Sequence, residues 1–383
     1  MKMKRKIAVV TTSRADYCHL YWPLHDLARH PDVDLKLIAM GPHLSPEFGS
    51  TVREIERGGF DIAARIECLL SSDTDIGMAK TIGVAMLSLA DCLGQMRPDL
   101  TLLIADRYEM LAPAAVALAL RIPIAHIEGG EISEGAIDDA VRHALTKMSH
   151  VHFTSTFQAR DRVIALGEEE WRVHRAGAPS IDHLRRNTLL TREQLEQQLS
   201  IDLFQASVVV AYHPVTIVRD TTREADALFA ALLEVPGRIL FCYPNADAGS
   251  RELIARTERF LAQRSDTRVF VNLPALTYLS LLLQADVMVG NSSSGIMETP
   301  SFALPTVNVG MRQQRRERAC NVLDAAPEKS DILAKVTLAR SDEFRRSLEG
   351  MQNPYGDGYA SEKIVSVLTS VSLGEQLLIK KMR

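Results

Sequence analysis

The chain has 383 residues, more than a single ordinary domain, so two or three compact units are expected. Hydrophobic residues make up 46% and charged residues 24%, which is typical of folded globular proteins and excludes a disordered chain. The formal net charge of −4 argues against a protein that binds nucleic acid through its phosphates, since such proteins are usually basic. A small anionic ligand is compatible with this charge, because it responds only to the local field.

The sequence predicts neither a membrane span nor a secreted protein. Its longest apolar run, 110–120, is interrupted by Pro113 and is well short of the ~20 residues that a spanning helix needs. The basic amino end is followed by a strand-length apolar segment and not by the longer core of a signal peptide. The five cysteines are scattered without a CxxC pair, so we expect no disulfide framework, no metal site and a cytoplasmic location.

Taken in chain order, the first half alternates short apolar strands with longer helical segments. The expected strands are 7–12, 34–39, 100–105, 123–127 and 151–154, and the expected helices are 75–96, 108–120 and 138–149. This alternation is typical of βαβ units, in which helices cover both faces of a parallel sheet. Strands that are apolar throughout, such as TLLIA at 101–105, suit burial on both faces.

The pattern restarts after a polar, helix-prone segment at about 181–204. The second half is expected to contain strands 207–212, 238–242, 268–271, 287–289 and 305–309, and helices 222–234, 250–263 and 276–284. We therefore predict an α/β protein of two Rossmann-like, doubly wound parallel-sheet domains, 1–180 and 181–363, that face each other across a cleft. Such sheets bind ligands at the carboxyl ends of their strands, so the residues that follow each strand are the candidates for function.

Acidic residues follow two of the strands in the first half. Asp106 comes directly after TLLIA, where an aspartate could equally cap the next helix. Glu128 follows IPIAHI and opens a glycine-containing segment with five carboxylates in the twelve residues 128–139. Clustered carboxylates shift one another's pKa values, and glycines let the backbone approach a ligand closely. The segment is therefore predicted to act in acid–base chemistry, with Glu128 as the first candidate.

Candidate groups for holding an anion follow other strands. Arg14 and His213 each lie in a turn after a strand, a position that is more often structural than functional. The strand VMVG leads through NSSSG (291–295) into a helical segment, which offers hydroxyl and backbone N–H groups to a diphosphate. Four arginines at 312–318 could hold an anion or form a solvated face. Neither a Walker A sequence nor GxGxxG is present, which argues against a P-loop ATPase or a dinucleotide oxidoreductase.

Together these motifs resemble the hydrolysing UDP-N-acetylglucosamine 2-epimerases of sialic- and legionaminic-acid biosynthesis. The matching segments occur in the family's order and span nearly all of the chain: TTSRADY (11–17), ADRYEMLA (105–112), the block 126–153, HPVT (213–216), YPNADAGS (243–250), VGNSSSGIMET (289–299) and RQQRRERACNV (312–322). The non-hydrolysing branch of the family has segments similar to GDTTT and HVEAGLR at the positions where this chain has ADRYE and HIEGGE. One departure is Ala105, where the branch usually has Gly and for which little consequence is expected.

The resemblance implies a glycosyltransferase-B-like fold, with a UDP-binding second domain and a C-terminal helix at about 364–383 that packs back onto the first domain. It implies that UDP-GlcNAc and water give ManNAc and UDP, through elimination to a glycal and rehydration. The same reaction on UDP-2,4-diacetamido-2,4,6-trideoxyglucose is the alternative. No cofactor or metal is expected. The family's members suggest that the protein forms a homodimer or a homotetramer.

The site residues that the resemblance implies fall into two groups. The catalytic carboxylates would be Asp106, Glu128 and Asp138, with Glu131 in reserve. The nucleotide would be held by Arg14, Arg107, His213, Asn291, Ser292, Ser293, Glu298 and Arg316, with Glu298 on the ribose hydroxyls. The sequence does not tell which carboxylate acts in elimination and which in hydration.

Three other functions stay open. A non-hydrolysing epimerase would yield UDP-ManNAc and no free UDP, and the ADRYE and HIEGGE segments argue against it. A retaining glycosyltransferase of the same fold would need an acceptor and would not need the acidic segment. A non-catalytic nucleotide-sugar binder would hold UDP without turnover, and the retained carboxylates argue against it.

Overall fold

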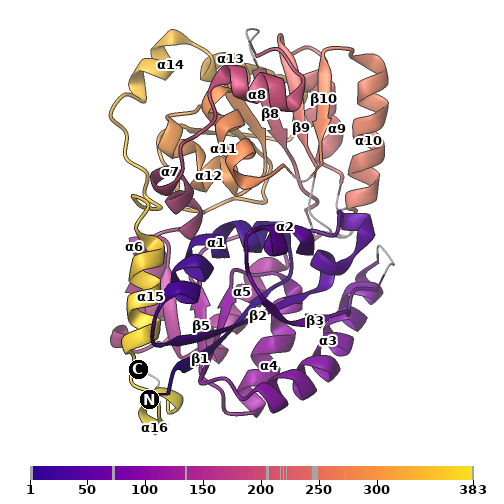
Figure 1. Ribbon diagram of the computed structural model, residues 1–383. Coiled ribbons are helices and arrows are strands. Elements are labelled where there is room, and N and C mark those ends of the chain that lie inside the picture. The colour runs from indigo at the N-terminus through magenta and orange to yellow at the C-terminus, as the bar shows by residue number, and fades with distance from the viewer. Residues whose placement is uncertain are drawn as a thin grey trace. The chain divides into compact units, whose positions relative to one another are not determined.

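A computed structural model describes residues 3–70, 74–133, 136–203, 207–215, 217–218, 220, 222–243, 249–271 and 273–381. The chain divides into two compact units, which Figure 1 draws from indigo to yellow along the chain. Unit 1 comprises Met1–Glu131, Asp138–Asp182 and Tyr355–Arg383, and unit 2 comprises Ile132–Ile137 and His183–Pro354. Of the predicted motifs, Glu134, Gly135, Thr216 and 244–248 lie outside the described residues.

The described strands of unit 1 form one parallel sheet in the order β3-β2-β1-β4-β5-β6-β7. Their bounds are Arg5–Thr11 (β1), Val33–Met40 (β2), Ile62–Ile66 (β3), Leu100–Ile104 (β4), Ile124–Ile127 (β5), Val151–Thr154 (β6) and Val173–Arg175 (β7). The strand order reverses between β1 and β4, which pair directly through Ile7 and Leu100. In doubly wound sheets ligands bind at such a reversal, beyond the carboxyl ends of the strands.

Helices accompany the strands of unit 1. They are Arg14–Arg29 (α1), Val52–Arg57 (α2), Asp75–Met96 (α3), Leu111–Ala119 (α4), Asp138–Met148 (α5), Phe157–Ala165 (α6) and Asp182–Arg186 (α7), the last of which extends into unit 2. The predicted helix 108–120 is divided into a 3₁₀ turn at Tyr108–Met110 followed by α4. Pro113 stands in the first turn of α4, where a missing N–H costs no helical hydrogen bond.

Helix α3 bears on the expectation that the chain has no membrane span. We predicted no membrane span, yet within the described part of the chain α3 is long and apolar enough to cross a bilayer by length and composition alone. In unit 1 its stripe of Thr81, Ala85, Leu89 and Leu93 is buried, and the helix packs against α4 and β3. A helix that covers an α/β sheet passes the same test, so this one helix is weak evidence for a membrane span, and 28% of its apolar window is buried.

The described strands of unit 2 form a second parallel sheet in the order β10-β9-β8-β11-β12-β13. The strands are Ser207–Ala211 (β8), Arg238–Cys242 (β9), Thr267–Phe270 (β10), Val287–Gly290 (β11), Thr306–Val309 (β12) and Val322–Ala325 (β13). The helices are Arg192–Leu199 (α8), Ala225–Leu232 (α9), Ser250–Gln263 (α10), Ala275–Gln284 (α11), Ser294–Met297 (α12), Lys329–Ala339 (α13) and Asp342–Ser347 (α14). The order reverses between β8 and β11, so the predicted fold of two doubly wound parallel sheets is confirmed.

Successive residues of a strand point to opposite faces of its sheet. Because the residues of β8 are apolar in succession, both faces of the second sheet are apolar there. Val208 and Val210 of β8 pack in one cluster with α9 and α13, whereas Val209 packs in another with α8 and α11. The continuous apolar run SVVVA is therefore the pattern of a central strand that helices cover on both sides.

The end of the chain belongs to unit 1 and is held there by polar contacts. Helix α15 (Ala360–Ser370) packs against α1, and in Figure 1 it is the yellow helix beside the indigo one. At the end of the short helix α16 (Glu375–Leu378), Arg172 donates hydrogen bonds to the carbonyls of Leu377 and Ile379 at 2.8 and 3.0 Å. The C-terminal segment therefore forms two helices with a break between them.

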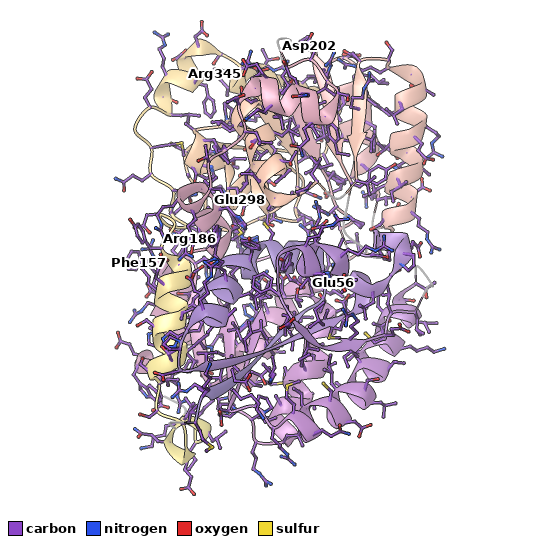
Figure 2. All side chains as sticks on the ribbon, viewed as in Figure 1. Glu56, Phe157, Arg186, Asp202, Glu298 and Arg345 are labelled. Atoms are coloured by element: carbon purple, nitrogen blue, oxygen red, sulfur yellow. The ribbon has the colours of Figure 1, made fainter. Side chains whose placement is uncertain are left out.

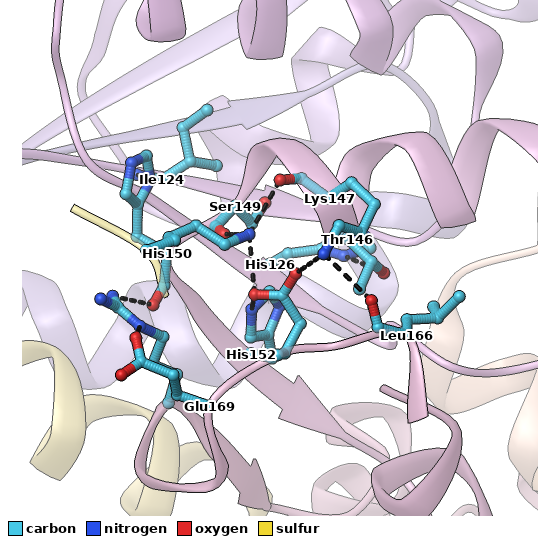
Figure 3. Close-up of polar contacts among 12 residues, drawn as sticks. Ile124, His126, Thr146, Lys147, Ser149, His150, His152, Leu166 and Glu169 are labelled. Atoms are coloured by element: carbon cyan, nitrogen blue, oxygen red, sulfur yellow. Dashed lines mark hydrogen bonds and ion pairs between the residues drawn. The ribbon is translucent and has the colours of Figure 1, made fainter. Parts of the chain in front are cut away.

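A buried carboxylate, Glu168, holds this region together through His152 and Lys147, which Figure 3 labels. It accepts hydrogen bonds from His152 Nε2 at 3.1 Å and Lys147 Nζ at 2.6 Å, and Lys380 Nζ lies 2.7 Å away. Burial by itself would raise the pKa of Glu168, but these donors lower it to about 2. Because the folded-state pKa lies below the ordinary value, the charged carboxylate stabilises the fold above pH ~4.5 and ceases to do so as the pH falls towards 2.

Glu168→Gln is accordingly expected to lower the free energy of unfolding by about 1–2 kcal/mol at pH 7, since a neutral amide leaves two ammonium groups without their carboxylate. The difference between variant and wild type should shrink as the pH falls from 4.5 to 2. Urea unfolding at a series of pH values measures both quantities. A difference that stays constant down to pH 2 would contradict the role of the charge.

Candidate functional site

Two strand ends of unit 1 hold their backbones in a conformation that is uncommon outside glycine. Ala105, directly after β4, has a φ of +55°, and Glu128, directly after β5, has a φ of +67°. Each left-handed residue of this kind costs roughly 1–2 kcal/mol, and such residues cluster at functional sites. We expected little consequence from alanine at position 105, because alanine is small. The left-handed φ nevertheless costs alanine free energy that glycine, which adopts this φ freely, would not lose.

Glu128 is held from several sides at the end of β5. Its backbone N–H donates to the carbonyl of Phe153 on the neighbouring strand β6 at 2.7 Å. Its side chain is 6% exposed, and its Oε1 lies 2.6 Å from Nδ1 of His19 on α1. The sequence pointed to Glu128 but not to His19, although His19 lies one turn beyond Asp16 on the same helix.

Asp106 lies at the adjacent strand end and forms an ion pair with Arg142 of α5. Arg142 is 2% exposed, and its Nη1 is also 3.7 Å from Oδ1 of Asp139. Asp138, the predicted third carboxylate, is the first residue of α5 and is half-buried. The structure thus brings a buried cation, which the sequence reading missed, to the carboxylates that follow β4 and begin α5. The signal available was its position one turn into the helix that the acidic segment begins.

Two further predicted residues lie in the interior of unit 1. Glu131 has no exposed surface, and Tyr355 Oη donates to its Oε2 at 3.3 Å. Arg107 is 6% exposed, and its Nη2 lies 3.1 Å from Oε1 of Glu109, which has no exposed surface. Burial raises the pKa of Glu109, and the Arg107 guanidinium opposes that rise. The described contacts of Glu131 and Arg107 are therefore ones that hold the fold around the strand ends.

The turn after β1 is built around Asp16. Its carboxylate accepts hydrogen bonds from the backbone N–H groups of Thr12 and Ser13 at 3.1 Å and from the Thr12 hydroxyl at 2.6 Å. Ser13 and Asp16 together form a capping box that starts α1. Burial raises the pKa of Asp16, whereas the Thr12 hydroxyl donor lowers it. Arg14, the first residue of α1, is half-buried next to this turn.

In unit 2 a single amide side chain joins the ends of β8 and β11. The backbone N–H of His213 donates to Asn291 Oδ1 at 2.7 Å, and Asn291 Nδ2 donates back to the His213 carbonyl at 2.9 Å. The Asn291 carbonyl accepts from Arg312 Nη1 and Gln313 Nε2, each at 3.1 Å. Asn291 has no exposed surface, so its role is to hold the turn residues around it in place. His213 is 8% exposed.

Asn291→Ala removes two buried hydrogen bonds and is expected to lower the free energy of unfolding of unit 2 by about 2 kcal/mol. Asn308→Ala is the matched control, because Asn308 is also buried and its amide donates to Asp324 at 2.8 Å. Thermal unfolding measures the stability of both variants, and a separate titration of the folded proteins with UDP measures their binding. An Asn291 variant no less stable than the Asn308 variant would contradict the positioning role.

The serine turn after β11 presents hydroxyl groups at the end of that strand. Ser292 and Ser293 are half-buried, and Ser292 Oγ accepts from the Ser294 N–H at 3.3 Å. The following helix α12 spans only Ser294–Met297, so the predicted helix is too short to contribute a full macrodipole. Any anion binding here therefore depends mainly on the hydroxyl and N–H groups of the turn.

Glu298 and Arg316 lie near this turn in unit 2 and are each 5% exposed. Glu298 directly follows α12, and Figure 2 labels it. Arg316 Nη1 donates to Gln313 Oε1 at 3.1 Å, and Gln313 in turn donates to the Asn291 carbonyl. All six predicted residues of the second half follow the ends of β8, β11 or β12 in the sequence.

Comparison with known proteins identifies the family of this chain. The family model described as UDP-N-acetylglucosamine 2-epimerase matches residues 25–369. A Campylobacter jejuni protein named GDP/UDP-N,N'-diacetylbacillosamine 2-epimerase (hydrolyzing) is 37% identical over 90% of both chains. A Legionella pneumophila protein named UDP-N,N'-diacetylbacillosamine 2-epimerase (hydrolyzing) is 36% identical over 99% of both chains.

The fold also has solved counterparts. The crystal structure of UDP-GlcNAc 2-epimerase from Neisseria meningitidis bound to UDP-GlcNAc superposes with a TM-score of 0.81 at 19% identity, over 95% of this chain and 99% of that one. A similarity at this identity supports the architecture of two Rossmann-like sheets. With the family match over most of the sequence and the extended similarity to hydrolysing relatives, the chain belongs to the UDP-N-acetylglucosamine 2-epimerase family.

Proposed function

We propose that this protein is a hydrolysing UDP-sugar 2-epimerase that converts a UDP-linked 2-acetamido sugar and water into the free C2 epimer and UDP. The observation that carries the proposal is Glu128, a buried carboxylate in a left-handed turn at a strand end, 2.6 Å from His19. Asp106 with its Arg142 partner follows the adjacent strand. Family membership makes a role for these carboxylates in moving the C2 proton the simplest reading.

The reaction requires proton transfer at C2 of the sugar and stabilisation of the departing diphosphate at C1. The C2 proton is barely acidic, because C2 bears the acetamido nitrogen and neither of its neighbours, C1 and C3, is a carbonyl carbon. Departure of UDP from C1 builds positive charge on the sugar ring, and this acidifies the C2–H bond. A carboxylate then removes the proton to leave a glycal, and water adds back so that C2 receives a proton on the opposite face. We propose Asp106, Glu128 and Asp138 for these proton transfers.

The departing diphosphate needs fixed donors and positive charge. In unit 2 we propose that His213, Ser292, Ser293 and Arg316 supply them, and that Glu298 binds the ribose hydroxyls. Asn291 supports this group by holding the ends of β8 and β11 together. Arg14 is the proposed contribution of the first unit, while Arg107 acts indirectly through its buried pair with Glu109.

For the sugar, UDP-2,4-diacetamido-2,4,6-trideoxyglucose is the first candidate. The two relatives at 36% and 37% identity carry this sugar, as diacetylbacillosamine, in their names. UDP-GlcNAc is the second candidate, because the family model that covers 25–369 is described by it.

The experiment is to incubate the protein with UDP-2,4-diacetamido-2,4,6-trideoxyglucose, its GDP counterpart and UDP-GlcNAc separately, and to quantify the free nucleoside diphosphate and the free sugar. We expect equal amounts of free UDP and a free 2-epimer, with the highest kcat/KM for the diacetamido sugar. An epimerised sugar that stays attached to UDP would identify a non-hydrolysing enzyme instead. Nucleotide binding without turnover in every incubation would identify a binding protein.

A further inference from the structure

The contact between His19 and Glu128 joins two elements that are distant in sequence. His19 lies on α1 and Glu128 follows β5, 109 residues later. The separation of 2.6 Å between Nδ1 and Oε1 is short for a nitrogen–oxygen hydrogen bond and is typical of a charge-assisted one. The side chains are 18% and 6% exposed, so water screens their attraction little.

Backbone contacts fix both partners of this pair. The capping box of Ser13 and Asp16 ties the first turn of α1 to the end of β1, and His19 follows three residues after Asp16. Glu128 is held by its left-handed φ and by the hydrogen bond of its N–H to Phe153. Because neither backbone is free to adjust, the geometry of the pair is a property of the fold and not of two flexible surface side chains.

We propose that His19 is a positioning residue for the reaction: it holds Oε1 of Glu128 and stabilises its negative charge, so that Oε2 exchanges the proton at C2 of the sugar. The proposal rests on the proposed function. In the elimination the C2–H electrons form the C1–C2 double bond, the C1–O electrons leave with UDP, and the proton goes to Oε2. In the hydration, water gives its hydroxyl to C1 and a proton is returned to C2, so the proton taken first is released to solvent.

Any test must distinguish the effect of His19 from the effects of the other charged and titratable groups around the pair. Asp16 faces it from α1, Arg107 and Glu109 follow β4, and His126 lies on β5. Burial lowers the pKa of His126 to about 4, and its Nε2 lies 2.8 Å from the Ala105 carbonyl, so it stays neutral in a neutral assay. These groups are unchanged in a His19 variant, so differences from the wild type report on His19.

The test compares three substitutions on α1. His19→Asn keeps an N–H donor close to the position of Nδ1, whereas His19→Gln places its donor close to the position of Nε2. His25→Ala is the control, because His25 lies on the same helix and its Nδ1 also contacts a carboxylate, Asp26, at 3.1 Å. For each variant, kcat and KM are measured from pH 5 to 9 with the sugar that the wild type turns over best, and UDP affinity and thermal stability are recorded.

We expect His19→Gln to lower kcat by at least about 30-fold, with UDP affinity within about twofold. The acidic limb of its kcat profile should move upward by about one pH unit, because Glu128 loses an imidazole whose protonated form stabilises the carboxylate. His19→Asn should recover about tenfold of that kcat but keep the shifted limb, and His25→Ala should match the wild type. If His19→Gln does not fold, His19→Asn alone carries the test through its shifted limb.

Wild-type kcat and an unshifted acidic limb in the folded His19 variants would overturn the proposal. Equal loss of kcat and of UDP affinity without a shifted limb would overturn it as well, since that result indicates a structural role only. A wild-type protein that turns over none of the nucleotide sugars would instead refute the proposed function itself. The two failures are therefore distinguishable by the behaviour of the unmodified protein.

Discussion

Glu128→Gln is expected to lower kcat by about 10³-fold or more and to leave UDP affinity within about twofold of the wild type. The substitution keeps the size of the side chain and a hydrogen-bond acceptor for His19, but an amide cannot take a proton from carbon. The diphosphate is held by other groups in our proposal, so binding should persist. Steady-state kinetics with UDP release, together with calorimetric titration of UDP, measure the two effects.

Glu170→Gln is the control for this prediction. Its side chain is 61% exposed and pairs on the surface with Arg160, so both kcat and UDP affinity should be unchanged. Turnover at the wild-type rate in Glu128→Gln would show that Glu128 is not the acid–base group, and Asp106 and Asp138 would then be the remaining candidates.

Gly130→Ala is expected to lower the free energy of unfolding of unit 1 by about 2–5 kcal/mol. The φ of Gly130 is +79°, and a Cβ there would lie 2.1 Å from the carbonyl oxygen of Ala159 on α6. The left-handed backbone costs about 1–2 kcal/mol for an alanine, and forcing α6 away from the turn costs about 1–3 kcal/mol more. Because Gly130 follows Glu128 by two residues, the displaced turn should also reduce turnover.

Gly59→Ala separates the two contributions, since Gly59 has the same φ of +79° with nothing within 4 Å of its added Cβ. We expect it to cost only the backbone share, about 1–2 kcal/mol. Urea unfolding of both variants gives the comparison. Equal losses of stability would mean that the clash with Ala159 is relieved cheaply and that the turn after β5 tolerates movement.

The central strands were predictable because they are apolar on both faces. TLLIA and SVVVA read as buried strands, and β4 and β8 lie in the middle of their sheets. The strands that we did not predict are β3, β7 and β13, all at sheet edges. In β3 half-buried and exposed residues alternate and only Ile66 is buried, and β7 has only three residues, so neither carries enough apolar pattern to be recognised.

The candidate site was predictable only in part, for a physical reason. Ligands bind where parallel strands end, so residues that follow strands, such as Asp106 and Glu128, stand out in the sequence. Their partners come from helices: Arg142 is 36 residues from Asp106, and His19 is 109 residues from Glu128. Such pairings depend on how the helices pack on the sheet, so the position of Arg142 near the start of its helix could suggest a role but could not identify Asp106 as its partner. The buried state of Glu131 was likewise invisible, because its hydrogen bond comes from Tyr355, 224 residues away.

The account's central claim is that the sugar is epimerised by elimination and rehydration and not by simple hydrolysis of the nucleotide bond. The most direct measurement is the reaction in D₂O enriched in ¹⁸O, with the free sugar analysed by NMR and mass spectrometry before its anomeric oxygen exchanges with solvent. We predict a product inverted at C2 that carries one deuterium at C2 and one ¹⁸O at C1. A free sugar with unchanged C2 configuration and no deuterium there would contradict the account.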